Sequence, residues 1–507
     1  MLARHREALV AAAVAASVAA LLAWLAPPGG DMAAHVYQRG LFLRNGFTLW
    51  DNYWYAGRYA FVGYSVLYYP LSALLGILPL AVLTVAVSAG AFAALLEREW
   101  GASARWASGA FAALWAGVLI TGEFPFALGI ALALLALLAL QAGRRWAGAL
   151  LILLVVAASP VAFVVLAAVL IGAGLGLRRH SLIPAAALFV AAVAELVLLQ
   201  LFPAGGTLGF PWSEALEAVA FCLGGIALTR DAANARILRG IFGVYLVAVA
   251  LSWAVPSGLG HDVARIRLLA LPVALLLASL RRWRPLPVVL AAVALAAVWN
   301  VWPLAAGWTA SAADGSAAAK VWTAPVAYLH AHLRPGYRVE AVDTSQHWSA
   351  YYLAGEGIPL VRGWFRQDDF PFNELLYERF TPAEYLSWLR GLGVAYVVLT
   401  RFPPDHTSRA EAQLVRSGAV FGLKRVFATA DVAIYAVPDP RPITSAHVIA
   451  LHQASLTIRV PRAAIYRIAV RWSPYWHASA GRLSEARDGT IELRTTTPGV
   501  VRITFAP

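Results

Sequence analysis

The residues best suited to chemistry lie near the N-terminus, between positions 27 and 65. Asp31 and His35 are four positions apart in a segment with helical character, so they would share one helical face. A carboxylate there could take the proton of an attacking hydroxyl as a general base. Because Asp31 directly precedes the helical run, it could equally be an N-cap, and the sequence leaves both roles open.

The same stretch is rich in aromatic and charged side chains. Trp50, Asp51 and Arg58 lie there among several tyrosines. Aromatic rings in such a loop either stack on a substrate or form a belt at the membrane surface, and an arginine can bind phosphate through charge-assisted hydrogen bonds. His35, Trp50, Asp51 and Arg58 are therefore candidate substrate-binding residues.

Three more candidates follow later in the chain. Glu123 could supply a second carboxylate or be a solvated loop residue. Arg265 and Arg267 lie where arginine is otherwise scarce, so they would bind either a substrate phosphate or lipid headgroups. No third ligand accompanies His330 and His332 at a useful spacing, and no phosphate-binding glycine loop occurs. We therefore predict no metal site and no cofactor.

The composition places most of the chain in a membrane. Of its 507 residues 13% are charged and 60% are apolar, and the mean hydropathy is +0.67, whereas a soluble protein has about 25% charged residues. The 40 Lys and Arg exceed the 27 Asp and Glu by 13, which in a soluble protein would suggest a nucleic-acid partner. Here many arginines lie in short gaps between apolar runs, as in cytoplasmic loops, so no nucleic-acid partner is expected.

About eleven membrane crossings are expected. The positive-inside rule favours a turn at Ser159-Pro160, because only then do Arg178 and Arg179 lie on the side of the N-terminus. With a cytoplasmic N-terminus, the odd number of crossings places the C-terminal tail outside the cytoplasm. The run at 66–96 is long and contains prolines, so it is either a tilted or a broken span. The other apolar runs are 8–26, 106–121, 125–142, 146–158, 161–177, 182–202, 212–229, 236–255, 264–280 and 286–303.

The predicted fold is a polytopic α-helical membrane protein with a C-terminal extracytoplasmic region. Residues 1–303 form the transmembrane domain, with residues 27–65 as its first outside loop. Residues 304–440 combine strands with a helix at 381–393, which indicates an α/β domain. Residues 441–507 hold short alternating runs between turn signals, which indicates a small antiparallel β-sandwich. The strands predicted in the α/β domain are 338–342, 358–361 and 395–400.

Three short motifs resemble the first outside loop of GT-C glycosyltransferases. They are DMAAH (31–35), NGFTLWDNYWYAG (45–57) and YYPLSALLG (68–76), preceded by one span and followed by many. The chain is most similar to a bacterial branch of the family with an extracytoplasmic C-terminal domain. The resemblance covers most of the chain, through GEFPFALG (122–129), Ser159-Pro160, LRGLGVAYVVLT (389–400) and RWSPYWHASAGR (471–482).

This resemblance implies a function. GT-C enzymes use a sugar linked to a polyprenyl phosphate in the membrane, and the family's essential acidic residue on the first loop corresponds by position to Asp31. Tyr69, in the third motif, joins the candidate substrate-binding residues. The acceptor would be an envelope glycan, lipid or protein outside the cytoplasm. The chain departs from the best-understood members because Met32, and not a second acidic residue, stands beside Asp31.

Two other functions compete with this prediction. A lipid or polysaccharide transporter would need ionisable residues within its spans, yet Glu195 is nearly the only acidic residue there. A non-catalytic envelope-assembly protein would bind a partner through its tail. In that case Asp31 would be replaceable.

Overall fold

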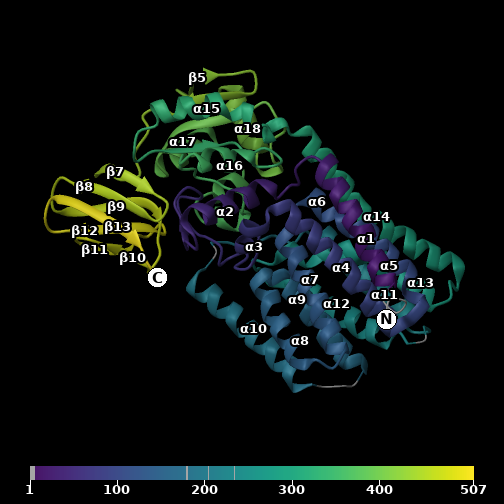
Figure 1. Ribbon diagram of the computed structural model, residues 1–507. Coiled ribbons are helices and arrows are strands. Elements are labelled where there is room, and N and C mark those ends of the chain that lie inside the picture. Colours follow the sequence, from purple (N-terminus) through teal and green to yellow (C-terminus); the bar gives the residue numbers. More distant parts are fainter. Residues whose placement is uncertain (1–5, 178–180, 204, 233) are drawn as a thin grey trace. The chain divides into compact units, whose positions relative to one another are not determined.

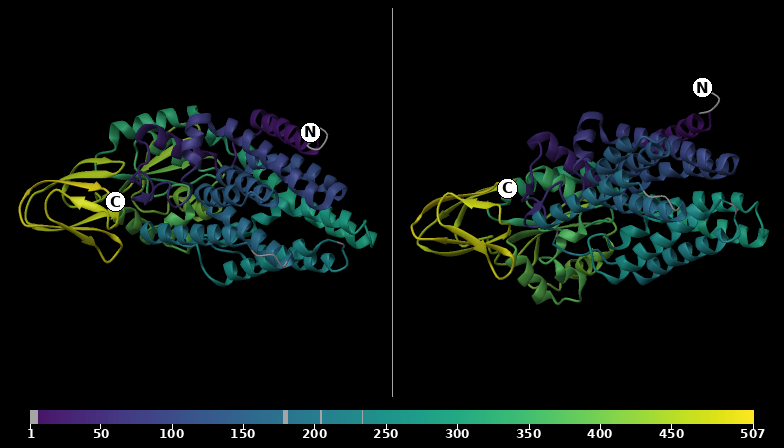
Figure 2. Two further views of the ribbon diagram at one scale, coloured as in Figure 1. Left: turned by 60° about the horizontal axis from the view of Figure 1, so that its bottom comes forward. Right: turned by 90° about the horizontal axis from the view of Figure 1, so that it is seen from below.

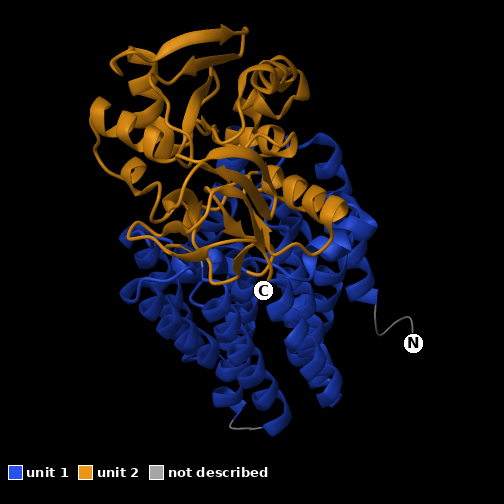
Figure 3. Ribbon diagram, turned by 90° about the vertical axis from the view of Figure 1, so that its left-hand side faces the viewer, with its two compact units in different colours: residues 1–29, 63–203, 207–309 blue, residues 30–62, 204–206, 310–507 orange. Residues whose placement is uncertain are grey.

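The computed structural model describes residues 6–177, 181–203, 205–232 and 234–507. The chain divides into two compact units (Figure 3). Unit 1 comprises residues 1–29, 63–203 and 207–309, and unit 2 comprises residues 30–62, 204–206 and 310–507. The first loop therefore groups with the C-terminal region, and not with the apolar helices that flank it in the sequence.

Unit 1 consists of apolar helices that run alongside one another (Figure 1 and Figure 2). Within the described residues, nine helical segments are long and apolar enough to cross a membrane. The sequence predicts about eleven crossings. The two numbers differ because residues 77–121 form one helical segment of 45 residues and α8 (Arg145–Ala158) has only 14. The number of crossings and their orientation stay predictions.

The remaining helices of this part of the chain follow the apolar runs of the sequence. They are α1 (Arg6–Leu25), α3 (Tyr68–Leu75), α4 (Ile77–Trp100), α5 (Arg105–Leu114), α6 (Val118–Thr121), α7 (Phe124–Gln141), α9 (Pro160–Leu177), α10 (Leu182–Leu201), α11 (Trp212–Thr229), α12 (Arg236–Ala254), the 3₁₀ helix η4 (Gly260–Leu269), α13 (Ala270–Leu280) and α14 (Leu286–Ala313).

Two helix breaks agree with the sequence. The predicted span 66–96 is broken at Gly76, whose φ of 87° separates α3 from α4. Ser159 is extended and separates α8 from α9, so the predicted turn at Ser159-Pro160 is confirmed. Arg178 and Arg179, on which the charge argument for this turn rests, lie outside the described residues.

Close helix packing in unit 1 depends on small residues. The helices α9 and α12 approach so closely that a Cβ atom on Gly240 would lie 2.0 Å from the carbonyl oxygen of Gly172. A larger side chain at position 240 would force the two backbones apart. Glycine therefore permits this contact, as small residues commonly do between membrane helices.

The α/β part of unit 2 contains β3 (Arg338–Ala341), β4 (Val394–Thr400), β5 (Lys424–Ala428) and β6 (Val432–Ala436), with α15 (Ala319–His332), α16 (Trp348–Gly355), α17 (Pro382–Gly391) and α18 (Arg409–Ser417). The strand order is β3-β4-β6-β5, and only β3 and β4 are parallel. α17 begins where predicted, with a capping box between Thr381 and Glu384. The predicted strand 358–361 is reduced to a single bridge between Leu360 and Val339.

Residues 441–507 form two antiparallel sheets, as predicted (Figure 1). The strands are β7 (His447–His452), β8 (Ser455–Val460), β9 (Ala464–Arg471), β10 (Trp476–Ala478), β11 (Arg482–Glu485), β12 (Thr490–Thr495) and β13 (Gly499–Phe505), in the orders β10-β13-β8-β7 and β11-β12-β9. In β8, Ile458 is buried and its neighbour Arg459 is exposed, the alternation of a strand with one face in a core. The sequence does not predict β10 and β11, because strands of three and four residues carry little periodic signal.

The first loop folds as part of unit 2. It contains α2 (Met32–Asn45) and two short strands, β1 (Trp50–Asp51) and β2 (Arg58–Tyr59), which pair with each other. Its backbone is bonded to both halves of the C-terminal region. The N–H of Leu360 donates to the carbonyl oxygen of Tyr53, and that of Arg471 donates to the carbonyl oxygen of Ala56, each at 2.8 Å. The loop that the sequence assigned to the transmembrane domain is thus a structural part of the C-terminal region.

Candidate functional site

Asp31 lies directly before α2, in the N-cap position, and is partly buried. Its φ of −88° and ψ of −1° are helical, whereas a capping residue usually has an extended backbone. None of the N–H groups of α2, all of whose residues are described, donates to the Asp31 side chain as a cap. The Asp31 side chain therefore does not cap α2.

The start of α2 is held by residues on either side of Asp31. The indole Nε1 of Trp364 donates to the carbonyl oxygen of Gly30 at 3.3 Å. On the other side, the N–H of His35 donates to the carbonyl oxygen of Asp31 at 3.2 Å, and the His35 side chain is fully buried. Trp364 also lies edge-on to His347, with 6.4 Å between the ring centroids. These contacts fix the position of Asp31 relative to the α/β part of unit 2.

Trp50 and Asp51, both predicted to bind substrate, are fully buried in unit 2. Trp50 stacks on Phe505 of the last strand, with 4.8 Å between the ring centroids. Asp51 accepts hydrogen bonds from the Tyr37 hydroxyl at 3.0 Å and from the Tyr53 N–H at 2.9 Å. Burial raises the pKa of Asp51 to about 6. The protein itself thus supplies partners to both side chains.

Arg58 is also buried, and its charge is compensated within unit 2. Its Nε lies 2.6 Å from a carboxylate oxygen of Asp368, and its guanidinium lies over the ring of Phe365, 4.3 Å from the centroid. Arg471 donates to the backbone carbonyl of the same Asp368 at 2.6 Å. The Nη1 atom of Arg58 is buried and has no hydrogen-bond partner among the described residues. These bonds connect the first loop to the C-terminal region.

A second group of buried charges lies in the α/β part of unit 2. The guanidinium of Arg362 lies 3.5 to 3.6 Å from carboxylate oxygens of Asp343, Asp369 and Glu411. A fourth carboxyl group, that of Glu340, is fully buried on β3. Burial and the neighbouring Glu411 raise the pKa of Glu340 well above its usual value. The neutral, protonated form of Glu340 is therefore favoured, and Arg362 faces the three other carboxylates of the cluster.

One feature of the sequence points to this cluster. Glu340 interrupts the apolar strand RVEAV, and a carboxyl group in a buried strand requires a partner. Asp343 follows β3 and also lies 3.3 Å from Nδ1 of His347. The carboxyl end of parallel strands is where α/β proteins commonly bind ligands. Here, however, Asp343, Asp369 and Glu411 are buried and paired with Arg362, so the cluster connects separate segments of unit 2.

In unit 1 the structure brings Glu123 and Arg265 together. Glu123 lies 3.4 Å from Nε of Arg265, and Asp262 lies 2.9 Å from its Nη2. The guanidinium also lies over the ring of Phe126, 5.1 Å from the centroid. Two carboxylates therefore surround one arginine, so its positive charge is already compensated by the protein.

Arg267 and Tyr69, also in unit 1, have different surroundings. Arg267 lies two positions after Arg265 on η4, and its buried Nε has no hydrogen-bond partner among the described residues. Tyr69 is buried on α3 with its ring edge-on to that of Tyr68. Of the candidates in unit 1, Arg267 thus has a buried donor that no described residue pairs with.

The candidate residues fall into two groups. Asp31, His35, Trp50, Asp51 and Arg58 belong to unit 2, and the other four belong to unit 1. The part of the chain that the structure describes contains no group of three or more His, Cys, Asp or Glu that could hold a metal ion. The chain matches no model of a known protein family and no curated protein.

Proposed function

We propose that the chain is a membrane glycosyltransferase of the GT-C type, which moves a sugar from a polyprenyl-phosphate carrier to an envelope glycan, lipid or protein. The observation that carries this proposal is the position of Asp31. Its carboxylate lies at the start of α2 and does not cap the helix. The long apolar helices of unit 1 are consistent with a protein that meets its lipid-linked donor in the membrane.

In the proposed reaction, a hydroxyl of the acceptor attacks the anomeric carbon of the sugar. Asp31 takes the proton of that hydroxyl as the new carbon–oxygen bond forms. The bond from the anomeric carbon to the phosphate oxygen breaks, and its electron pair leaves with the polyprenyl phosphate. Because the acceptor attacks the face opposite the leaving group, the configuration at the anomeric carbon is inverted.

The leaving phosphate carries negative charge, which cations and N–H donors stabilise. In unit 1, Arg267 is the candidate for binding a lipid phosphate, because its Nε has no hydrogen-bond partner among the described residues. Arg265 is held by Glu123 and Asp262 and would act by positioning η4. Arg58 is engaged by Asp368, and its proposed role is to hold the first loop in place.

The proposal includes an orientation in the plasma membrane of a bacterium. Arg144 before α8, Arg145 at its first position and Arg230 after α11 are exposed at helix ends. The positive-inside rule assigns such arginines to the cytoplasm. By the same rule the N-terminus is cytoplasmic, and unit 2, with Asp31, lies outside.

Asp31→Asn and Asp31→Ala test the proposed base. The purified full-length protein would be given a panel of polyprenyl-phosphate hexoses and pentoses, and released polyprenyl phosphate would be measured. Neither variant loses a capping bond of α2, and both should react about 100 to 10,000 times more slowly. Asp439→Asn is the matched control, since this aspartate of unit 2 is 98% exposed, and it should react at the wild-type rate. Near-normal transfer by Asp31→Asn would refute the assignment and favour an assembly role.

A further inference from the structure

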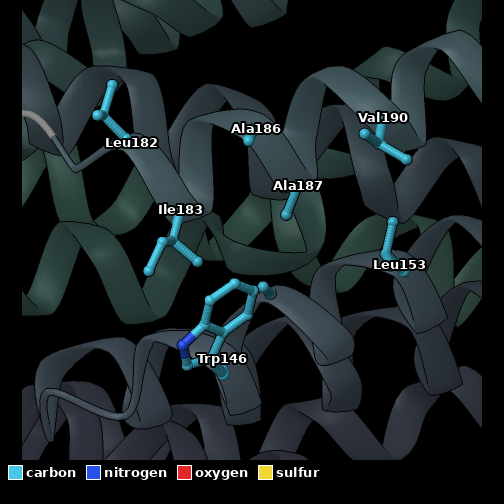
Figure 4. Close-up of a pocket in the computed structure, with 8 residues that line it drawn as sticks. Trp146, Leu153, Leu182, Ile183, Ala186, Ala187 and Val190 are labelled. Carbon is cyan, nitrogen blue, oxygen red and sulfur yellow. The ribbon is translucent and has the colours of Figure 1, made fainter.

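An open apolar groove lies between α8 and α10, two neighbouring helices of unit 1 (Figure 4). Its volume is about 330 Å³. Trp146 and Ile183 lie across from each other in the groove, at the end where both helices begin (Figure 4). The lining residues, none of them charged or polar apart from the indole nitrogen, are Trp146, Ala149, Leu153, Leu182, Ile183, Ala186, Ala187 and Val190.

The groove has the surface of a lipid-facing site. Trp146 is 77% exposed and Leu182 is 88% exposed, and α10 is long and apolar enough to cross a membrane. On such helices, large exposed apolar side chains meet acyl chains and not water. From Trp146 to Leu153 the helix rises about 10 Å. This length fits within one leaflet, whose hydrocarbon layer is about 15 Å thick.

Two positive charges stand at the end of the groove where α8 begins. Arg144 and Arg145 directly precede Trp146, and both are exposed. Among the described residues, neither arginine has an ion-pair partner. Tryptophan is typical of the membrane–water interface, so Trp146 indicates that the two guanidinium groups lie at headgroup level. From the start of α8 along the groove, the surface is thus first cationic, then aromatic and then apolar.

We propose that this groove binds one acyl chain of an anionic phospholipid, whose phosphate is held by Arg144 and Arg145. Basic residues beside a gap between membrane helices provide the charge that such a headgroup requires, and a zwitterionic lipid would gain less from them. The positive-inside rule places this lipid in the cytoplasmic leaflet. The site requires that α8 and α10 lie in a membrane, and it does not depend on sugar transfer.

Native mass spectrometry of the purified full-length protein tests this proposal. Phosphatidylglycerol, phosphatidylcholine and a polyprenyl phosphate would be titrated separately, and the dissociation constant of the first bound lipid would be measured. Phosphatidylglycerol should bind more tightly than phosphatidylcholine. In Arg144→Gln/Arg145→Gln it should bind about 30-fold more weakly, which corresponds to two surface charges of about 1 kcal/mol each.

Matched variants separate the groove from general effects. Arg98→Gln/Arg230→Gln removes the same charge from exposed arginines elsewhere in unit 1 and should bind like the wild type. Ala186→Trp fills the groove and should lose the lipid, whereas the same change at the neighbouring exposed Ala185, which does not line it, should not. Equal binding of the two phospholipids, or unchanged binding by Arg144→Gln/Arg145→Gln, would overturn the proposal. Displacement of phosphatidylglycerol by equimolar polyprenyl phosphate would reassign the groove to the carrier lipid.

Discussion

Arg58 and Asp368 form a buried ion pair, with Nε 2.6 Å from the carboxylate, although 310 positions separate them in the sequence. Only 4% of the arginine side chain and 12% of the aspartate side chain are exposed. Removing one partner leaves the other charge buried without its counter-charge. The cost of that state, and not the attraction within the pair, determines what a substitution does.

We expect Arg58→Gln to lower the free energy of unfolding of unit 2 by about 3 to 5 kcal/mol. Arg401 and Asp431 are the control, because they form an ion pair at the same 2.6 Å in which the arginine is 67% exposed. Arg401→Gln should cost at most about 1 kcal/mol. Denaturant unfolding of the full-length protein measures both. Equal losses would show that burial of the Arg58 pair has no effect on stability.

The buried carboxyl of Asp51 predicts a pH effect of definite sign. Its pKa is 3.8 in the unfolded chain and about 6 in the folded protein, because burial disfavours its charge. Between these values the folded state keeps a proton that the unfolded state has lost, so this group's contribution to stability falls as the pH rises from 4 to 6. The fall is about 3 kcal/mol in total.

Asp51→Asn should abolish this fall. The free energy of unfolding of the variant, relative to that of the wild type, should rise by up to about 3 kcal/mol between pH 4 and pH 7. Asp488→Asn is a control in which the pH effect should have the opposite sign. Although burial raises the pKa of Asp488, hydrogen bonds and Arg467 lower it overall. Its stability relative to the wild type should fall over the acidic range as the pH rises. If the free energy of unfolding of Asp51→Asn and that of the wild type changed with pH in the same way, the raised pKa of Asp51 would be contradicted.

The cluster around Arg362 predicts opposite outcomes for two neutralising changes. Burial and Glu411 raise the pKa of Glu340 and favour its neutral form, so Glu340→Gln should change the free energy of unfolding by less than about 1 kcal/mol. Arg362→Gln removes the cation that Asp343, Asp369 and Glu411 share and should cost about 3 to 5 kcal/mol. Thermal or denaturant unfolding at pH 7 measures both. A large loss in Glu340→Gln would mean that Glu340 is ionised.

Local sequence patterns predict much of this fold. A helix in a membrane must be long and apolar, and a strand with one buried face must alternate, so both leave signals within a few residues. The packing of the first loop with the C-terminal region leaves no such signal in the sequence. It depends on contacts such as Arg58 with Asp368 and Tyr53 with Leu360, whose partners are about 300 positions apart.

The candidate site was predictable to a smaller extent. An aspartate before a helix has the same sequence pattern whether it caps the helix or not, so only the geometry of α2 distinguishes the roles of Asp31. Glu123 and Arg265 were proposed from separate observations, and the structure places them in contact. The Arg362 cluster was missed, because its members are spread from Glu340 to Glu411 without a common spacing.

The proposed orientation can be tested with single cysteines. The background is Cys222→Ala, because Cys222 is the one natural cysteine of the chain. Ser417→Cys in unit 2 and Ala142→Cys after α7 place thiols at exposed positions. A membrane-impermeant thiol reagent applied to intact cells should label position 417 and not 142, while both should react after lysis. Labelling of position 142 alone would reverse the orientation and place Asp31 in the cytoplasm with the rest of unit 2.

Arg267 and Arg265 allow donor binding to be separated from structural support within one short helix. The buried Nε of Arg267 has no partner among the described residues, so Arg267→Gln should leave thermal stability nearly unchanged. If this N–H holds the donor phosphate, the KM for a polyprenyl-phosphate sugar should rise about 10- to 150-fold, as expected for one charge-assisted hydrogen bond.

Arg265→Gln should behave differently, because it leaves Glu123 and Asp262 facing each other without their cation. The expected result is a lower midpoint of thermal unfolding, and a rise in KM no larger than that of Arg267→Gln. Arg98→Gln, at an exposed arginine near the end of α4, controls for the loss of one positive charge and should change neither quantity. An unchanged KM in Arg267→Gln, together with normal stability, would remove Arg267 from the donor site. It would leave contact with lipid headgroups as the explanation for an arginine at this position.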